Sequence, residues 1–214
     1  MELYTFFRSS TSFRVRIALA LKGLSYEAHY TSLPKMAHKD PAYLKVNPQG
    51  LVPTLVDDSG RVFTQSLATI EYLDEKHPQP PLLPKDAEGR WYVRALSQII
   101  GCDMHPLNNT RVLKYLKGPF GIAPERVDGE WYGHWIAEGF RDLEAFLNTN
   151  KRFGRFCLGD AVTMADVCLA PQAFNAERFN VDITPYPTVK QIYDTCLAHP
   201  AFQAAHPANQ ADAF

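Results

Sequence analysis

The sequence has almost no net charge. Its 214 residues include 22 lysines and arginines against 23 aspartates and glutamates, a formal net charge of −1 at pH 7. Without an excess of positive charge there is no basic field for nucleic acid and no polybasic anchor for a membrane surface. We therefore expect neither partner, and recognition of a charged ligand has to come from local groups of residues.

Long apolar runs are also missing. No stretch of about 18 apolar residues occurs, and the opening MELYTFF lacks the charged and apolar regions of a signal peptide. No internal repeat or low-complexity tract is present. With 46% hydrophobic residues the chain can still fill a core. We expect a soluble, cytoplasmic protein with one large domain or two modest ones.

Paired cysteines are absent as well. The four cysteines, Cys102, Cys157, Cys168 and Cys196, lie far apart, form no C-x-x-C pair and share no metal-ligand spacing with the seven histidines. Each lies in an apolar context, which predicts buried, reduced thiols in a reducing compartment. The pattern therefore predicts no metal site and no cysteine nucleophile.

The first 80 residues alternate between strand and helix signals. Strands are predicted at residues 2–7, at 25–33, from about 54, and up to 64. Apolar residues at helical spacing from Phe13 to Leu24 predict a helix that closes at Gly23, and a second helix follows Ser66, the predicted cap. Residues 58–60 predict a hairpin turn. The order is βαβαββα, which counts a further helix between the second and third strands, with one parallel pair and one hairpin.

A proline-rich segment divides the chain. Residues 78–89 (PQPPLLPKDAEG) carry four prolines in seven positions, and neither helix nor sheet continues through such a run. Beyond it the predicted helices cover residues 88–117, 124–149, 163–179 and 186–198. Thr163 and Asp166 have the spacing of a capping box. We expect one α/β domain over 1–80 and one all-helical domain over 88–214.

The turn in FFRSSTSFRVRIAL, residues 6–19, is rich in hydrogen-bond donors. It holds three arginines and four hydroxyl side chains between an apolar strand and an apolar helix. The first turn of a helix has unpaired N–H groups and a partial positive charge, so an anion is the favoured ligand. The hydroxyls of residues 9–11 suit a thiolate or a carboxylate. Serine and threonine at this place are also the usual helix caps.

Two further segments point to the same kind of ligand. A cis bond between Val52 and Pro53 would present the backbone N–H and C=O groups of Val52 to a peptide, although a trans turn is the commoner form. Gln65 and Ser66 end a strand at a helix N-terminus, where they can hold a carboxylate or serve as a cap. Each signal alone is weak.

In the second half, DMHPLNNTRVLK places polar residues on adjoining faces of one predicted helix, which Pro106 is expected to kink. His105 and Asn109 are four apart, and Asn108 and Arg111 three apart. A ligand-binding face and a solvated face both fit this pattern.

The segments RSSTSFRVRIALALKGL, NPQGLVPTL and TQSLATIEYLDEKHP resemble the glutathione S-transferase superfamily. GDAVTMADVCLAPQ, NAERFNVDITPYPTV and LLPKDAEGRWYVRAL look like its zeta class, so that the resemblance covers nearly the whole chain. It implies a thioredoxin-like first domain that binds glutathione as a cofactor, an all-helical second domain with the substrate pocket, and a homodimer.

The resemblance also implies roles for single residues. Ser9, Ser10 and Arg8 are the implied catalytic residues, with Ser9 donating a hydrogen bond to the glutathione sulfur. The implied glutathione contacts are Ser9, Ser10, Thr11, His38, Gln49, Val52, Pro53, Gln65, Ser66, His105 and Asn109. The implied grips on substrate carboxylates are Arg8, Arg111 and Arg178, although arginines at the ends of elements are also typical surface charges or caps. Thr11 replaces the family's cysteine and is assigned a contact only, and Phe13 replaces its tryptophan.

The activity that the resemblance implies is glutathione-dependent cis–trans isomerisation of a small dicarboxylic keto acid in aromatic-compound catabolism. Maleylpyruvate or maleylacetoacetate would become the fumaryl isomer by thiolate addition, bond rotation and thiol elimination. Arg111 favours maleylpyruvate, because many zeta-class members lack an arginine there. One alternative is a transferase that conjugates glutathione to small electrophiles, and another is a non-catalytic binding module of the same fold.

Overall fold

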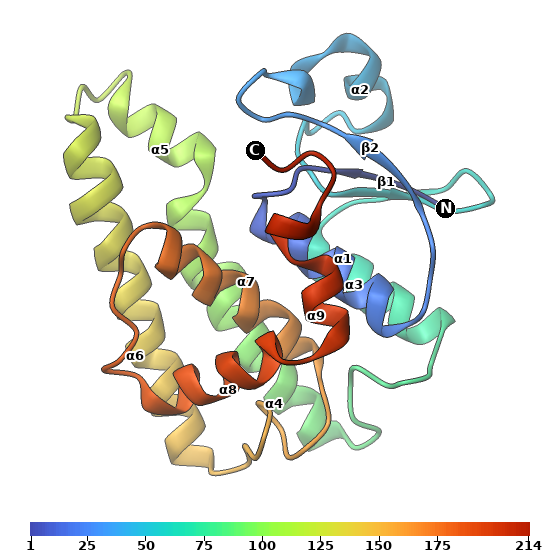
Figure 1. The fold of residues 1–214 in the computed structure, drawn as a ribbon, viewed down its shortest axis with the longest axis vertical. Coiled ribbons are helices and arrows are strands. Elements are labelled where there is room, and N and C mark those ends of the chain that lie inside the picture. The colour runs from blue at the N-terminus through green and yellow to red at the C-terminus, as the bar shows by residue number, and fades with distance from the viewer. The chain divides into compact units, whose positions relative to one another are not determined.

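The computed structural model describes residues 1–214, which form two compact units. The first unit comprises Met1–Leu82 together with Ala198–Phe214, and the second comprises Leu83–Leu197 (Figure 1). None of the helices combines the length and the apolar character needed to cross a membrane.

The first unit is built on a four-stranded mixed sheet with the order β2-β1-β3-β4. The strands are β1 (Glu2–Thr5), β2 (Glu27–Tyr30), β3 (Thr54–Val56) and β4 (Val62–Phe63). β1 runs parallel to β2 and antiparallel to β3, which pairs with β4 in a hairpin. Leu3 and Leu55 face each other in the register and are fully buried. The predicted parallel pair and hairpin are confirmed.

The helices of this unit are α1 (Ser10–Leu21), α2 (Pro41–Val46), α3 (Ser66–Lys76) and α9 (Pro200–Ala205). α1 and α3 lie on one side of the sheet and α2 on the other (Figure 1). Phe13 and Ile17 of the predicted apolar face are buried, but so is every other residue from 12 to 19, so α1 is enclosed on all sides there and is not amphipathic as predicted. Gly23, with φ +64°, follows the end of α1 in the left-handed conformation that glycine adopts without strain.

The last residues of the chain pack with the first unit, whereas the sequence grouped all residues from 88 onward in one helical domain. The reason is α9, a six-residue helix that lies against α1. Arg16 in α1 donates a hydrogen bond from Nε to the Ala205 carbonyl at 3.1 Å. Neither contact is visible in local sequence patterns, because nearly 200 residues separate the partners.

The second unit is all helical, as predicted. Its helices are α4 (Ala87–Gln98), α5 (Thr110–Lys117), α6 (Tyr132–Asn150), α7 (Met164–Arg178) and α8 (Pro187–Leu197). The single helix predicted over 88–117 is wrong. A π-helical turn at Ile99–Met104 and a 3₁₀ turn at His105–Asn108 separate α4 from α5. Pro106, which has no N–H to donate, lies in the 3₁₀ turn, where the predicted kink is found.

The capping box predicted at the start of α7 is present. Asp166 accepts the N–H and the hydroxyl of Thr163 at 2.7 and 2.8 Å, and also the N–H of Cys157 at 2.7 Å. The Asp166 side chain is fully buried, and burial raises the pKa of its carboxyl group. It therefore holds two loop segments on the end of one helix.

Three of the four cysteines are buried, as predicted, but Cys102 is exposed. Cys102 lies in the π-helical turn, where Ile100 and Met104 face the core in its place. The local apolar context was therefore misleading, because helical geometry turns only part of such a stretch inward.

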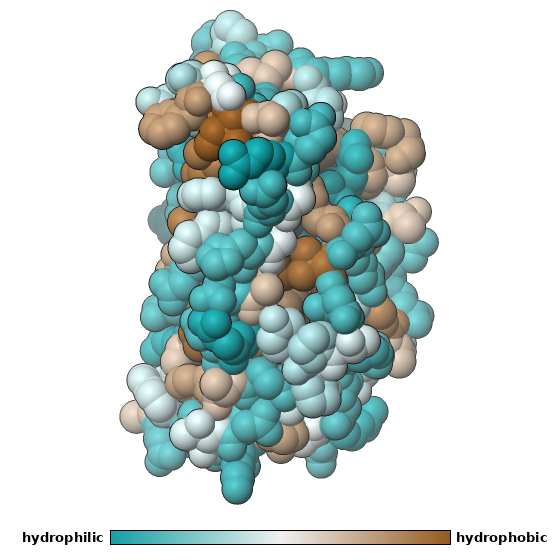
Figure 2. Space-filling model, turned by 90° about the vertical axis from the view of Figure 1, so that its left-hand side faces the viewer, coloured by the Kyte–Doolittle hydropathy of each residue, from teal (hydrophilic) through white to brown (hydrophobic).

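In the face of the molecule drawn in Figure 2, hydrophilic residues predominate and apolar residues form small, separate groups.

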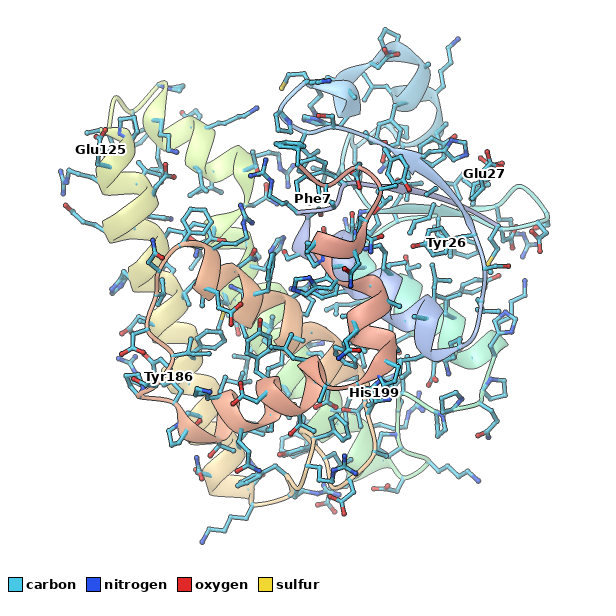
Figure 3. All side chains as sticks on the ribbon, in the orientation of Figure 1. Phe7, Tyr26, Glu27, Glu125, Tyr186 and His199 are labelled. Atoms are coloured by element: carbon cyan, nitrogen blue, oxygen red, sulfur yellow. The ribbon has the colours of Figure 1, made fainter.

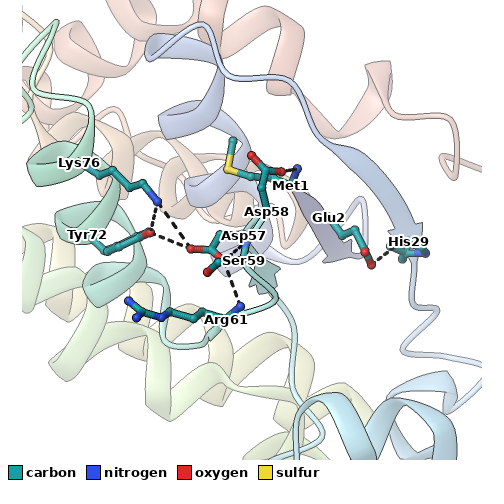
Figure 4. A network of polar contacts seen from close by, with 9 residues as sticks. All are labelled: Met1, Glu2, His29, Asp57, Asp58, Ser59, Arg61, Tyr72 and Lys76. Carbon is teal, nitrogen blue, oxygen red and sulfur yellow. Dashed lines mark hydrogen bonds and ion pairs between the residues drawn. The ribbon is translucent and has the colours of Figure 1, made fainter.

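A polar network closes the β3–β4 hairpin (Figure 4). One oxygen of Asp57 accepts hydrogen bonds from the N–H and hydroxyl of Ser59 and from the N–H of Arg61, at 2.6 to 3.0 Å. The other accepts the Tyr72 hydroxyl at 3.2 Å. The Ser59 hydroxyl is the largest cause that lowers the pKa of Asp57. The network ties the hairpin to α3.

Candidate active site

Ser9 is the residue that caps α1. Its hydroxyl oxygen accepts the N–H of Ser12 at 3.3 Å, and its own N–H donates to the Phe6 carbonyl at 3.0 Å. Ser10 is the first residue of the helix and is buried. The Ser9 hydroxyl therefore lies at the positive end of the α1 dipole, where a negative charge is stabilised.

Thr11 connects this cap to the neighbouring loop. Its hydroxyl donates to the Val52 carbonyl at 3.0 Å and lies 2.9 Å from the Ser9 hydroxyl. A hydroxyl has one hydrogen, and that of Thr11 goes to Val52, so Ser9 is the donor in the pair with Thr11. Rotation of the Ser9 hydroxyl can redirect this hydrogen to another acceptor, such as a sulfur anion.

The peptide bond between Val52 and Pro53 is cis, the form that the sequence left open. The Val52 carbonyl accepts the Thr11 hydroxyl, whereas the Val52 N–H donates to no group of the chain. This N–H is therefore left without an acceptor in the chain.

A buried polar group that the sequence analysis missed supports this loop. Asn47 donates from its amide to the Leu51 carbonyl and to the Thr54 hydroxyl, both at 2.9 Å. The Tyr43 hydroxyl donates to the same carbonyl of Leu51. Because these side chains point inward from a helix, its end and a strand, only the tertiary fold shows that they meet.

The same loop passes close to His38. Gly50 has φ +58°, and a Cβ atom there would lie 2.8 Å from the His38 carbonyl oxygen. Glycine at position 50 therefore allows the loop to approach the buried His38.

Gln65 precedes α3 with φ +68°, a strained conformation for a residue other than glycine. Its side-chain amide donates to that of Gln49 at 3.2 Å, so these two predicted contacts lie together. The sequence assigned the cap to Ser66, which is wrong: Gln65 occupies the cap position, and buried Ser66 is the first helical residue. The Ser66 hydroxyl accepts Arg14 Nη1 at 3.4 Å instead.

The two arginines within α1 do not face outward, although the sequence suggested donors for an anion. Arg14 and Arg16 are each 1% exposed. Arg16 donates to the carbonyls of Phe6 and Phe7 at 3.3 and 2.9 Å and to the Thr5 hydroxyl at 3.1 Å. Burial lowers the pKa of Arg16 to about 10, which leaves it protonated at neutral pH. It holds the backbone that leads to Ser9.

Arg8 is the exception among these arginines. It is half-buried beside the rings of Phe7 and Phe214, with its Cζ atom 4.9 and 4.7 Å from their centroids. Its Nε atom is buried and donates to no group of the chain. Arg8 thus retains donors for an anionic ligand.

The predicted contacts of the second unit do not share one helix, which corrects the sequence analysis. His105 lies in the 3₁₀ turn, and Asn109 is the extended cap of α5, accepting the N–H of Arg111 at 3.0 Å. Asn108 is buried and donates to the Tyr132 carbonyl at 3.1 Å, a structural contact. The side chain of Arg111 is exposed at the start of α5.

Arg178 is the last residue of α7. Its guanidinium donates to Asn175 Oδ1 at 3.3 Å and lies 5.3 Å from the centre of the Phe179 ring. Phe179 in turn stacks on Tyr132, with 3.6 Å between ring centroids. Burial raises the pKa of Tyr132 to about 12, an effect that Arg178 opposes, so the phenol is neutral at physiological pH.

The mixed sheet with helices on both sides, the serine at the start of its first helix and the helical second unit define a protein with the glutathione S-transferase fold. Residues 8–76 match the family model "Glutathione S-transferase, N-terminal domain".

Whole-length similarities narrow the assignment. The chain is 49% identical to a maleylpyruvate isomerase from Ralstonia sp. over 212 residues, 99% of each protein. A holo structure of a maleylpyruvate isomerase, described as a bacterial zeta-class glutathione S-transferase, superposes with a TM-score of 0.96 at 47% identity, covering 100% of both chains. A maleylacetoacetate isomerase from Methylobacterium extorquens AM1, with bound malonate and glutathione, gives a TM-score of 0.96 at 41% identity and full coverage of both. The chain belongs to the zeta class of the glutathione S-transferase family.

Proposed function

We propose that this chain is a glutathione-dependent isomerase that converts a maleyl keto-diacid, maleylpyruvate or maleylacetoacetate, into its fumaryl isomer in aromatic-compound catabolism. The observation that carries the proposal is the Ser9 hydroxyl at the start of α1. Its oxygen caps the helix by accepting the Ser12 N–H, and rotation can redirect its hydrogen from Thr11 to a sulfur anion. The similarity to isomerases over the full length supports the choice of reaction.

Glutathione, when bound, supplies a thiolate that attacks the cis double bond and permits its rotation. A free cysteine-type thiol has a pKa of about 8.5, so the site has to stabilise the anion to work near neutral pH. Ser9 does so by donating its hydroxyl hydrogen, and the N-terminus of α1 adds its partial positive charge. Ser10 and Thr11 complete the turn around the sulfur.

The remaining contacts hold the tripeptide. Val52 pairs its free N–H with a peptide carbonyl, beside Pro53, while Gln65 and Ser66 receive a carboxylate at the start of α3. The other proposed glutathione contacts are His38, Gln49, His105 and Asn109.

Arg8, Arg111 and Arg178 are proposed to bind the two carboxylates of the substrate, because a guanidinium matches a carboxylate in a bidentate way. The same cations stabilise the negative charge that develops on the substrate carbonyl during attack, an effect for which one donor is worth about 3 kcal/mol. No carbon acid has to be deprotonated, so no strong base is required. Malonate in the structure from M. extorquens supports a dicarboxylate as the ligand class.

The proposal includes the organisation of the protein. The proposed glutathione-binding domain spans residues 1–80 and the proposed substrate-pocket domain spans 88–214, of which residues 198–214 pack with the first unit. The proposed active form is a cytoplasmic homodimer.

Incubation with maleylpyruvate and glutathione tests the reaction. We expect the fumaryl isomer and an unchanged amount of free thiol. A consumed thiol and a thioether product would instead identify the conjugating transferase, and glutathione binding without turnover would identify the non-catalytic module.

The variant Ser9→Ala tests the mechanism. It should lower kcat roughly 100-fold, corresponding to about 3 kcal/mol, while the glutathione dissociation constant changes little. Ser25→Ala, at an exposed serine before β2, is the matched control. Full turnover in Ser9→Ala would remove this serine from the mechanism.

A further inference from the structure

The last residues of the chain return to the end of β1, next to the site. After α9 and a short turn at Pro207–Asn209, Asp212 Oδ2 accepts the N–H of Phe7 at 3.0 Å. The ring of Phe214 meets that of Phe7 edge to face, with 5.0 Å between centroids. Figure 3 labels Phe7, and the C-terminal segment passes beside it.

The backbone of Phe7 is consequently held from both sides. Asp212 takes its N–H, and Arg16 donates to its carbonyl at 2.9 Å. Arg8 is the next residue, and Ser9 follows it. The C-terminal segment therefore holds the backbone directly before Arg8 and Ser9, whose side chains are nearest the proposed chemistry.

Phe214 also contacts Arg8 directly. The guanidinium lies in the angle between the rings of Phe7 and Phe214, which are inclined by 65°. A cation over aromatic faces is held by the ring quadrupole while its N–H edge stays open to a carboxylate. The Arg8 Nε atom is buried and has no acceptor in the chain, so the guanidinium is not fully paired by the protein itself.

We propose that Asp212 and Phe214 are positioning residues, which direct the Arg8 guanidinium toward a carboxylate of the substrate. The inference rests on the proposed function, in which Arg8 binds the diacid. The proposed glutathione contacts Ser9, Val52 and Gln65 form hydrogen bonds that do not involve residues 211–214. The segment therefore governs use of the diacid and not affinity for the tripeptide.

The test is steady-state kinetics on maleylpyruvate, with the glutathione dissociation constant measured separately. Phe214→Ala should raise KM about threefold, and a chain that ends at Gln210 about tenfold, while glutathione binding stays unchanged. Phe214→Trp should restore KM, because its ring offers the better cation–π surface. Phe120→Ala, at a similarly exposed aromatic residue of the second unit, is the control.

A double-mutant cycle separates this inference from the proposed function. Arg8→Ala should raise KM, and Phe214→Ala should add nothing in that background. If Arg8→Ala raises KM while Phe214→Ala and the truncation do not, the positioning role is overturned and the function stands. If Arg8→Ala leaves KM unchanged, Arg8 is not a substrate contact, and the inference falls with that assignment. Weaker glutathione binding in the truncated chain would also overturn it.

Discussion

Each unit contains a fully buried charged side chain that binds backbone groups, but the two lie at different places relative to the candidate residues. Arg16 in the first unit binds the carbonyls of Phe6 and Phe7, directly before Arg8. Asp166 in the second binds N–H groups at the start of α7. Arg178 is at the opposite end of that helix, about 18 Å away at 1.5 Å per residue.

The difference separates two uses of a buried charge. In the first unit the charge supports the segment on which the proposed chemistry depends, so stability and activity should be coupled. In the second unit the charge organises a helix start far along the chain from any candidate contact, so its loss should affect stability alone.

The largest effect is expected for Arg16→Met. The substitution leaves three buried carbonyls and one hydroxyl without their donor, and the loss of such a buried group costs about 3–5 kcal/mol in the free energy of unfolding. Turnover should fall as well, because the segment before Ser9 loses its support. Urea unfolding and kcat measure the two effects, with Arg61→Met on the exposed hairpin as the control. Full turnover in a destabilised variant would show that the site does not depend on Arg16.

Asp166→Asn is expected to have the second largest effect, a loss of about 2–4 kcal/mol in the free energy of unfolding. The new amide nitrogen would face backbone N–H groups that have lost their carboxylate acceptor. The kcat and KM values of the folded fraction should stay at wild-type values. Asp142→Asn, at an exposed aspartate on α6, controls for the removal of charge. If fully folded Asp166→Asn has a reduced kcat, then activity depends on the buried charge in the second unit as well, and the two units do not differ in this respect.

Short-range signals in the sequence account for what could be predicted. The order of strands and helices follows from alternation, turns and caps within windows of about ten residues. The serine cap of α1, the capping box at Thr163 and the end of α1 at Gly23 are local for the same reason. The list of candidate site residues came from family resemblance, not from these signals.

Long-range partners account for what could not be predicted. Nothing in RVRIALAL distinguishes a guanidinium that binds its own backbone from one that binds a ligand, because an acceptor of Arg16 lies at Ala205. The contact of Asp212 with Phe7 spans a similar separation. The hydrogen bond from Asn108 to the Tyr132 carbonyl likewise joins residues that local sequence patterns do not bring together.

A change at Arg111 tests whether an exposed side chain of the second unit contributes to the reaction, in contrast to the buried Asp166. Arg111→Ala should raise KM for the diacid about tenfold, equivalent to 1.4 kcal/mol for a lost carboxylate contact, with unfolding and glutathione affinity nearly unchanged. Lys114→Ala, one turn further along α5, is the matched control. An unchanged specificity constant would remove Arg111 from the substrate site.

The smallest effect is expected for a change at Asp57. This change tests whether the loss of any polar network in the first unit lowers turnover. Val56 pairs with Glu2, so Asp57 lies near the start of β1, and the segment that leads to Ser9 leaves from the other end. Hydrogen bonds from Ser59 above all lower the pKa of Asp57 below its ordinary value of 3.8. The native state then binds the proton less readily than the unfolded state, so the stabilisation is present above about pH 4 and is lost as the pH falls towards the lowered value.

Asp57→Asn should therefore be less stable than the wild type at pH 7, with a difference that shrinks in acid and with normal turnover. Urea unfolding between pH 7 and pH 2, with Glu75→Gln at an exposed glutamate of α3 as the control, measures this dependence. A stability difference that stays constant over this range would mean that the charge of Asp57 does not stabilise the hairpin. A fall in turnover would mean that stability and activity are coupled throughout the first unit and not only at Arg16.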